Sequence, residues 1–255
     1  MTGPDPAPSS DAVPHPPFTW AGDGLVLLVA LTLPTLGTWL YFDVFAGQGR
    51  LPAALYSGTK LAQLLLPIAW MVLARRQKLR WPRWHRQSLI VGFAFGLLSV
   101  GVILGAYYLL SRHTTILAGT PEKLQAKLAD FGVTGVGGFI ALALFLSILH
   151  AAFEEYYWRW FVFGRLAVGL PVAAALLISS VGFAAHHVLV VKAYLPHEQF
   201  WTLAMGCGAA IAVGGAFWAW LYRWTGHIAG AWIAHVLADL AIMAVGFDLV
   251  KGNLT

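Results

Sequence analysis

Seven long apolar stretches constrain the fold of this chain more than any other feature of its sequence. A transmembrane helix needs about 20 mostly apolar residues. Only 11% of the 255 residues are charged, against roughly 25% in an average soluble domain. The sequence therefore predicts an all-α, polytopic membrane helical bundle with seven or eight transmembrane helices. The predicted spans lie near 24–45, 53–74, 88–111, 137–160, 170–191, 200–222 and 228–247.

Three regions follow along the chain. Residues 1–19 contain six prolines and no lysine or arginine, which predicts a disordered tail and not a signal peptide. Residues 20–132 are expected to form N-terminal membrane spans, with a basic cytoplasmic loop at 75–87 and an amphipathic segment at 120–131. Residues 133–248 contain the last four predicted spans.

The basic loop gives the predicted orientation. Six of the sixteen lysines and arginines lie within 75–86, interleaved with tryptophans. Such a pattern also occurs in nucleic-acid binders, but beside apolar spans it is typical of a cytoplasmic loop with an aromatic belt. We therefore expect a multi-pass protein of the bacterial cytoplasmic membrane with a cytoplasmic N-terminus, contacting the lipid bilayer and no nucleic acid.

The connection at 112–132 is longer than a turn. Thr120 can cap a helix there, with Pro121 at its first position. Leu124, Leu128 and Phe131 then share one stripe, so the segment predicts a short amphipathic helix on the membrane surface.

Charged residues interrupt the apolar fourth span in the segment HAAFEEYYWRW, 150–160. Helical neighbours diverge by about 100°, whereas residues four apart lie on one face. Glu155 can therefore pair with Arg159, while Glu154 is left in line with His150. One reading is a salt-bridged helix end at the interface; the other is that Glu154 is free to act on something else, as intramembrane charges often do.

Two later spans carry further polar residues. His186 and His187 lie deep in the apolar segment 179–190, and Phe183 can pack on the ring of His187. Because adjacent side chains diverge, we expect at most one of these two imidazoles to face a shared site. His235 and Asp239 lie one turn apart near the end of the chain. The polar residues of each of the three spans could be structural. One buried cluster of Glu154, His187, His235 and Asp239 would, however, give the polar residues of all three spans a polar neighbour.

A carboxylate with two imidazoles in a dry site can activate water and stabilise the resulting anion. The same four residues are all zinc-type ligands. The sequence contains neither H-E-x-x-H nor G-x-S-x-G.

In order, the motifs Glu-Glu-x-x-x-Arg (154–159), Phe-x-x-x-His (183–187) and His-x-x-x-Asp (235–239) resemble the CPBP family. This family comprises CAAX prenyl endoproteases and bacterial Abi-type, bacteriocin-processing-like membrane proteins. The resemblance covers about residues 137–245 and implies an intramembrane endopeptidase acting on a membrane-associated protein or peptide.

By motif, the resemblance implies that Glu154 activates water with help from His187, and that His235 and Asp239 stabilise the oxyanion. Glu155, Arg159 and Phe183 would support the site. Family members have been described both as metalloproteases and as metal-free glutamate proteases. If a divalent metal such as zinc is present, Glu154, His187, His235 and Asp239 would hold it. Asp239 departs from the asparagine frequent at its position, so it could instead orient His235.

Two other function classes remain open. The chain could be a catalytically idle membrane partner, such as an immunity protein, or a proton- or ion-coupled transporter that uses the same buried residues. Paired broken helices and inverted repeats, which are common in transporters, are not evident in the sequence.

Overall fold

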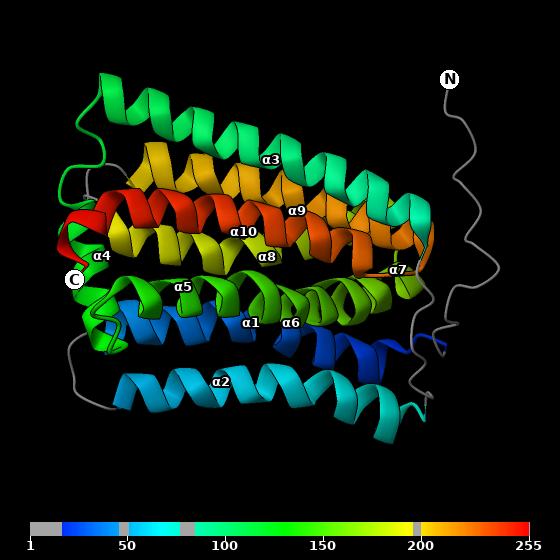
Figure 1. The fold of residues 1–255 in the computed structure, drawn as a ribbon. Helices are drawn as coiled ribbons and strands as arrows, with labels where there is room; N and C mark the ends of the chain where they lie inside the picture. Colours follow the sequence, from blue (N-terminus) through cyan, green and yellow to red (C-terminus); the bar gives the residue numbers. More distant parts are fainter. Residues whose placement is uncertain (1–16, 46–50, 77–84, 196–199, 255) are drawn as a thin grey trace.

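The computed structural model describes residues 17–45, 51–76, 85–195 and 200–254, and it places no strand among them. Within these residues, seven helices are long and apolar enough to cross a membrane, which confirms the predicted polytopic bundle (Figure 1). The predicted tail at 1–19 and basic loop at 75–87 lie mostly outside the described residues. The spans are Trp20–Val44, Leu51–Ala74, Arg86–His113, Val136–Gly169, Val172–Tyr194, Thr202–Thr225 and Ala229–Asn253.

Several spans combine α-helix with π-helical segments. The fourth span alternates most: two π segments, η4 and η5, flank the short helix α6 that carries the two glutamates. Single π turns inside α-helices are frequently found at functional sites. The elements are η1 (Trp20–Gly24), α1 (Leu25–Trp39), η2 (Leu40–Val44), α2 (Leu51–Ile68), η3 (Ala69–Ala74), α3 (Arg86–His113), α4 (Thr120–Asp130), α5 (Val136–Leu144), η4 (Phe145–His150), α6 (Ala151–Glu155), η5 (Tyr156–Phe163), α7 (Gly164–Gly169), α8 (Val172–Tyr194), η7 (Phe200–Ala204), α9 (Met205–Thr225), α10 (Ala229–Val250) and the 3₁₀ turn η8 (Lys251–Asn253).

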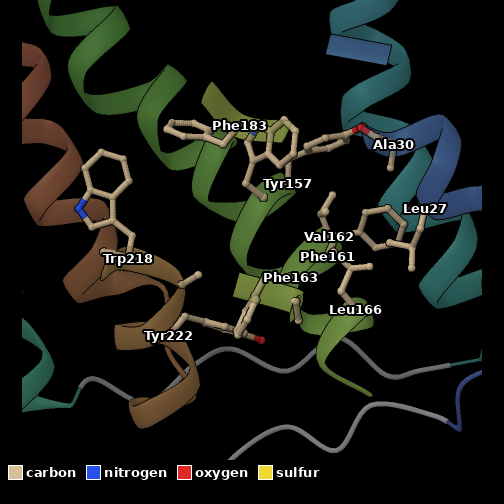
Figure 2. Packing of buried hydrophobic residues seen from close by; sticks show 14 of the residues in the cluster. Leu27, Ala30, Tyr157, Phe161, Val162, Phe163, Leu166, Phe183, Trp218 and Tyr222 are labelled. Atoms are coloured by element: carbon tan, nitrogen blue, oxygen red, sulfur yellow. The ribbon is translucent and has the colours of Figure 1, made fainter. Parts of the chain in front are cut away.

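The largest core cluster surrounds η5, where the fourth span is buried on nearly all sides. The side chains of η5 are aromatic or aliphatic apart from Arg159, and they pack against α1, α8 and α9. The Tyr157 hydroxyl donates a hydrogen bond of 2.8 Å to the carbonyl of Ala30 in α1, which satisfies its polar end. Figure 2 shows this cluster, which includes Leu27 and Ala30 from α1, Tyr157, Phe161, Val162, Phe163 and Leu166 from the fourth span, Phe183 from α8, and Trp218 and Tyr222 from α9.

Glycines allow α3 and α10 to approach closely near the start of both helices, at the end of the bundle where the two ribbons converge in Figure 1. A Cβ atom on Gly92 would overlap the backbone of Gly230, and one on Gly230 would overlap Ser88. Small residues at such crossings let membrane helices gain packing energy where no hydrophobic driving force exists between them. This contact fixes the position of α10, which carries His235.

A buried aspartate joins three spans at one end of the bundle. Asp23 has no exposed surface, and it accepts hydrogen bonds from the backbone N–H of Thr19 (2.7 Å) and from Trp70 Nε1 (2.9 Å). Arg165 lies 2.9 Å from Asp23 Oδ1, and Arg75 pairs with the other oxygen. The carboxylate therefore connects the first, second and fourth spans.

The amphipathic helix forms as predicted, as α4, but its start differs. Gly119 precedes it in a left-handed conformation (φ 78°), and no side chain caps its N-terminus. The predicted capping role of Thr120 is wrong, because Thr120 already lies in the helix and its hydroxyl donates to the carbonyl of Tyr194 at 3.1 Å. Leu128 is buried in a small second core with Phe139, so the helix is attached to the bundle.

Candidate active site

The fourth span separates the two glutamates as their spacing predicts. Glu155 Oε1 lies 3.0 Å from Arg159 Nη1, and both side chains are buried. Glu154 Oε1 lies 3.7 Å from His150 Nε2, one turn earlier on another face of the helix. The predicted self-neutralising pair is thus confirmed, and Glu154 is left to interact with other helices.

Glu154 lies at the centre of a cluster of imidazoles. Its Oε1 lies 3.3 Å from His186 Nε2, and its Oε2 lies 3.8 Å from the Nε2 atoms of both His187 and His235. The Glu154 side chain is buried, and Oε2 has no hydrogen-bond partner among the described residues. Buried carboxylate oxygens are rarely left without a partner, and where they are, a functional role is one explanation.

The expectation that only one of the adjacent histidines reaches the site is wrong. His186 and His187 both approach Glu154, and their ring centroids lie 4.0 Å apart. Their side chains diverge from the α8 backbone, but the two oxygens of one carboxylate are far enough apart for each imidazole to approach a different one. His186 is held by stacking on Trp158, with ring planes 2° apart.

The position of His187 identifies its free nitrogen. Its Nδ1 lies 2.9 Å from the carbonyl oxygen of Phe183, which can only accept a hydrogen bond. Nδ1 must therefore carry a proton, and in the neutral ring Nε2 keeps its lone pair toward Glu154. Phe183 also packs on this ring with centroids 4.5 Å apart, which confirms the predicted contact.

His235 is held by Glu155, a contact that the sequence alone did not predict. His235 Nδ1 lies 2.8 Å from Glu155 Oε1, and its ring stacks on Trp218 with centroids 4.3 Å apart. Asp239 Oδ1 lies 3.6 Å from Nε2 of His235, longer than a hydrogen bond of normal geometry. Glu155 therefore connects the arginine pair to the imidazole cluster.

Arg159 is enclosed by aromatic rings. Its guanidinium carbon lies 4.3 Å from the centroid of Phe183 and 4.9 Å from that of Trp218. These cation–π contacts favour the charged form without adding a second anion. Phe183 and Trp218 each contact both Arg159 and a histidine, so the aromatic residues fix the relative positions of charge and imidazoles.

The structure thus brings together Glu154, His187, His235 and Asp239, with Glu155, Arg159 and Phe183 packed around them. It adds four residues that the sequence reasoning did not assign to the site: His186, His150, Trp218 and Lys60. For Lys60 a signal existed, since it is the single charged residue within 51–74 and intramembrane charges usually mark function.

A metal ion has a suitable donor set here. Three ligand atoms lie within 4.8 Å of one another, one each from Glu154, His186 and His187. One carboxylate and two imidazoles match the ligands of catalytic zinc sites that keep an open position. These three ligands fit a divalent metal. They differ from the ligands predicted from the sequence, because His186 takes the place of His235 and Asp239.

Comparison with known proteins gives one match. Residues 136–241, less than half of the chain, match the Rce1-like family, described as type II CAAX prenyl endopeptidase Rce1-like. No curated protein and no solved structure matches the chain. The matched segment contains Glu154, His187, His235 and Asp239, and it supports a CAAX-type membrane protease in general. The resemblance carried by the three motifs is therefore confirmed, and residues 136–241 are similar to the Rce1-like type II CAAX prenyl endopeptidase family.

Proposed function

We propose that the chain is an intramembrane endopeptidase that hydrolyses a peptide bond of a membrane-associated protein or peptide, with water activated by Glu154. The observation that carries this proposal is the buried Oε2 of Glu154, which lies 3.8 Å from Nε2 of His187 and of His235. A water molecule bound between these atoms could hydrogen bond to all three. Residues 133–248 would form the catalytic core.

In this mechanism Glu154 acts as the general base. Its carboxylate takes a proton from water as the water oxygen attacks the carbonyl carbon of the substrate, and it then returns that proton to the leaving amine as the C–N bond breaks. The neutral Nε2 of His187 accepts a hydrogen bond from the attacking water and so orients it. His186, whose Nε2 lies 3.3 Å from Glu154 Oε1, keeps the carboxylate in place.

His235 would stabilise the oxyanion of the tetrahedral intermediate. Its Nδ1–H donates to Glu155, so Nε2 can donate as well only when the ring is protonated. The Glu155 carboxylate favours that cation, and Asp239 lies 3.6 Å from Nε2 on the other side. Removing one hydrogen-bond donor aimed at a developing oxyanion costs about 2.7–4 kcal/mol of transition-state stabilisation.

A divalent metal, if bound, would be held by Glu154, His186 and His187 and would supply Lewis acidity to water or to the substrate carbonyl. The residues around the metal ligands would keep the positioning roles described above. Glu155 and Arg159 would still position His235, and Phe183 would still hold His187.

Comparative peptidomics of membranes tests this proposal. Membranes that contain the wild-type protein should accumulate cleaved peptides that are absent with Glu154→Ala at equal protein abundance. Adding a chelator to wild-type membranes reports whether cleavage needs a metal. Identical peptide sets from wild type and Glu154→Ala would refute the protease and favour a catalytically idle membrane partner.

A further inference from the structure

The helix α4 crosses one end of the bundle, beside the C-terminus (Figure 1). Leu128 attaches it to the fourth and seventh spans, because this side chain is buried in the small core with Phe139 and Val250. On another face of α4, the Thr120 hydroxyl and Lys123 Nζ donate hydrogen bonds of 3.1 Å and 2.5 Å to backbone carbonyls at the end of α8. The helix is therefore held on the fourth, fifth and seventh spans.

Lys127 connects α4 to the first span. Its ammonium group donates a hydrogen bond to the Tyr41 hydroxyl in η2, and it lies 4.1 Å from the centroid of the Tyr41 ring. The ring centroids of Phe42 and Phe131 each lie 5.4 Å from the same nitrogen. Its carboxylate neighbour is Asp130, 3.4 Å away on α4 itself. Aromatic rings stabilise a cation without an anion, so Lys127 forms a latch between α4 and η2.

A row of polar side chains leads from this latch to Glu154. The Tyr41 ring contacts the ring of Tyr56 in α2, with centroids 4.9 Å apart, and Lys60 Nζ lies 5.4 Å from the Tyr56 centroid. The same Nζ lies 3.3 Å from His150 Nε2, which in turn lies 3.7 Å from Glu154 Oε1. All of these residues except Glu154 are partly exposed. Such a row suits the approach of water and of a peptide backbone, whose polar groups need partners inside an apolar bundle.

Glycines flank α4 at both ends. Gly119 before the helix and Gly132 after it have left-handed backbones, with φ angles of 78° and 71°. A Cβ atom on either glycine would meet nothing within 4 Å. Glycine takes up left-handed and right-handed conformations with similar ease, and lids that close active sites turn on a few residues at the ends of elements. The two glycines therefore allow α4 to move while the spans stay in place.

We propose that α4 is a lid on the route to Glu154, which Lys127 latches closed against Tyr41 and which opens to admit the substrate peptide. This inference rests on the proposed function, because it assumes that a peptide is cut at Glu154. Breaking the contact between Lys127 and Tyr41 frees α4 from the first span, while its contacts with α8 and with the small core keep it attached to the bundle. Lys127 is then a gating residue that does not touch the reacting atoms.

Thiol labelling tests the lid without requiring hydrolysis. Tyr56→Cys in a Cys207→Ser background places the single cysteine of the chain on the row of polar side chains, next to Tyr41. The protein is reconstituted in phosphatidylcholine nanodiscs and treated with sulfonatoethyl methanethiosulfonate, an anionic reagent that modifies thiols reached by water. Mass spectrometry of the intact protein gives the labelling rate.

Three substitutions are compared in this background: Lys127→Met, Lys127→Arg and Tyr41→Phe. Lys251→Met is the matched control, since it removes a lysine at the same end of the bundle whose partner, Asp248, is also exposed. We expect Lys127→Met to be labelled about tenfold faster than the parent protein, which corresponds to about 1.4 kcal/mol and to the loss of one hydrogen bond to a charged group.

The other variants separate the latch from a general loosening of the structure. Tyr41→Phe, which removes only the hydroxyl group, should also be labelled faster, whereas Lys127→Arg and Lys251→Met should keep the parent rate. Equal rates for Lys127→Met and the parent would overturn the inference, and so would an equal increase in Lys251→Met. If Lys127→Met does not fold, Tyr41→Phe decides, because an unchanged labelling rate in that variant overturns the latch.

Cleavage is a separate measurement on proteins that keep Tyr56. Because apparent affinity scales with the fraction of protein in the open form, Lys127→Met should raise kcat/KM for a membrane peptide by the same factor as the labelling rate. An unchanged kcat/KM beside faster labelling would overturn the role of α4 in substrate entry. If Lys127→Met is labelled faster but neither it nor the wild type cleaves any peptide, the proposed function fails while the control of access by α4 stands.

Discussion

Replacing Arg159 with methionine should strongly destabilise the protein. The change would leave the buried carboxylate of Glu155 with His235 as its remaining partner among the described residues. Removing one partner of a buried ion pair typically costs about 3–5 kcal/mol, because the other charge stays desolvated. The contacts of the guanidinium with Phe183 and Trp218 would be lost as well, at about 0.5–2 kcal/mol each. Since these effects overlap, we expect a total loss of about 3–5 kcal/mol.

A double-mutant cycle separates charge from packing. In Glu155→Gln with Arg159→Met both charges are gone, so the double variant should be less destabilised than the sum of the single variants by about 2–3 kcal/mol. Unfolding of the four purified proteins by SDS in mixed micelles, followed by circular dichroism, measures the coupling. Cleavage should not recover in the double variant, because His235 loses the carboxylate that binds Nδ1.

Two results would refute this reasoning. A cost below about 1 kcal/mol for Arg159→Met would mean that the pair behaves like an exposed one. Additive single effects would mean that Glu155 and Arg159 are not energetically coupled.

Two further predictions concern the scaffold. Gly92→Leu should prevent α3 from packing on α10 and lower the yield of folded protein, because even a Cβ atom at this position overlaps Gly230. Gly101→Leu, at an open position of α3, should be tolerated. Equal yields of the two variants in size-exclusion chromatography would contradict the role of this contact. Asp23→Asn should lower the free energy of unfolding by about 3–5 kcal/mol, since it leaves Arg165 buried without its carboxylate. Asp43→Asn, in a partly exposed pair, should cost about 1 kcal/mol or less, and a similar SDS-unfolding shift in both variants would contradict the argument.

The sequence predicts the spans and the local pairs because both follow from helix geometry. Apolar length alone locates the seven spans, and the four-residue spacing places Glu155 against Arg159 and Phe183 against His187. Contacts between helices are different, since periodicity shows which face is polar but not what it meets. The contact of Glu155 with His235 is of this kind.

The same limit explains what the sequence reasoning missed. Lys60 and His150 are 90 residues apart, and Asp23 and Arg165 are 142 apart. His186 and His187 both reach Glu154 because each imidazole approaches a different oxygen of its carboxylate. The divergence of adjacent side chains on a helix does not predict this arrangement. Such contacts depend on how the helices pack, and that packing is set by close approaches such as Gly92 on Gly230.

The most direct test of the central claim is the cleavage rate of Glu154→Gln in purified, nanodisc-reconstituted protein. Products from a membrane peptide identified by peptidomics would be quantified by mass spectrometry, with Glu122→Gln on the exposed face of α4 as the matched control. Loss of a general base typically lowers the rate about 10²–10⁴-fold, so we expect that loss for Glu154→Gln and a wild-type rate for Glu122→Gln. A Glu154→Gln protein that cleaves at the wild-type rate would contradict the account.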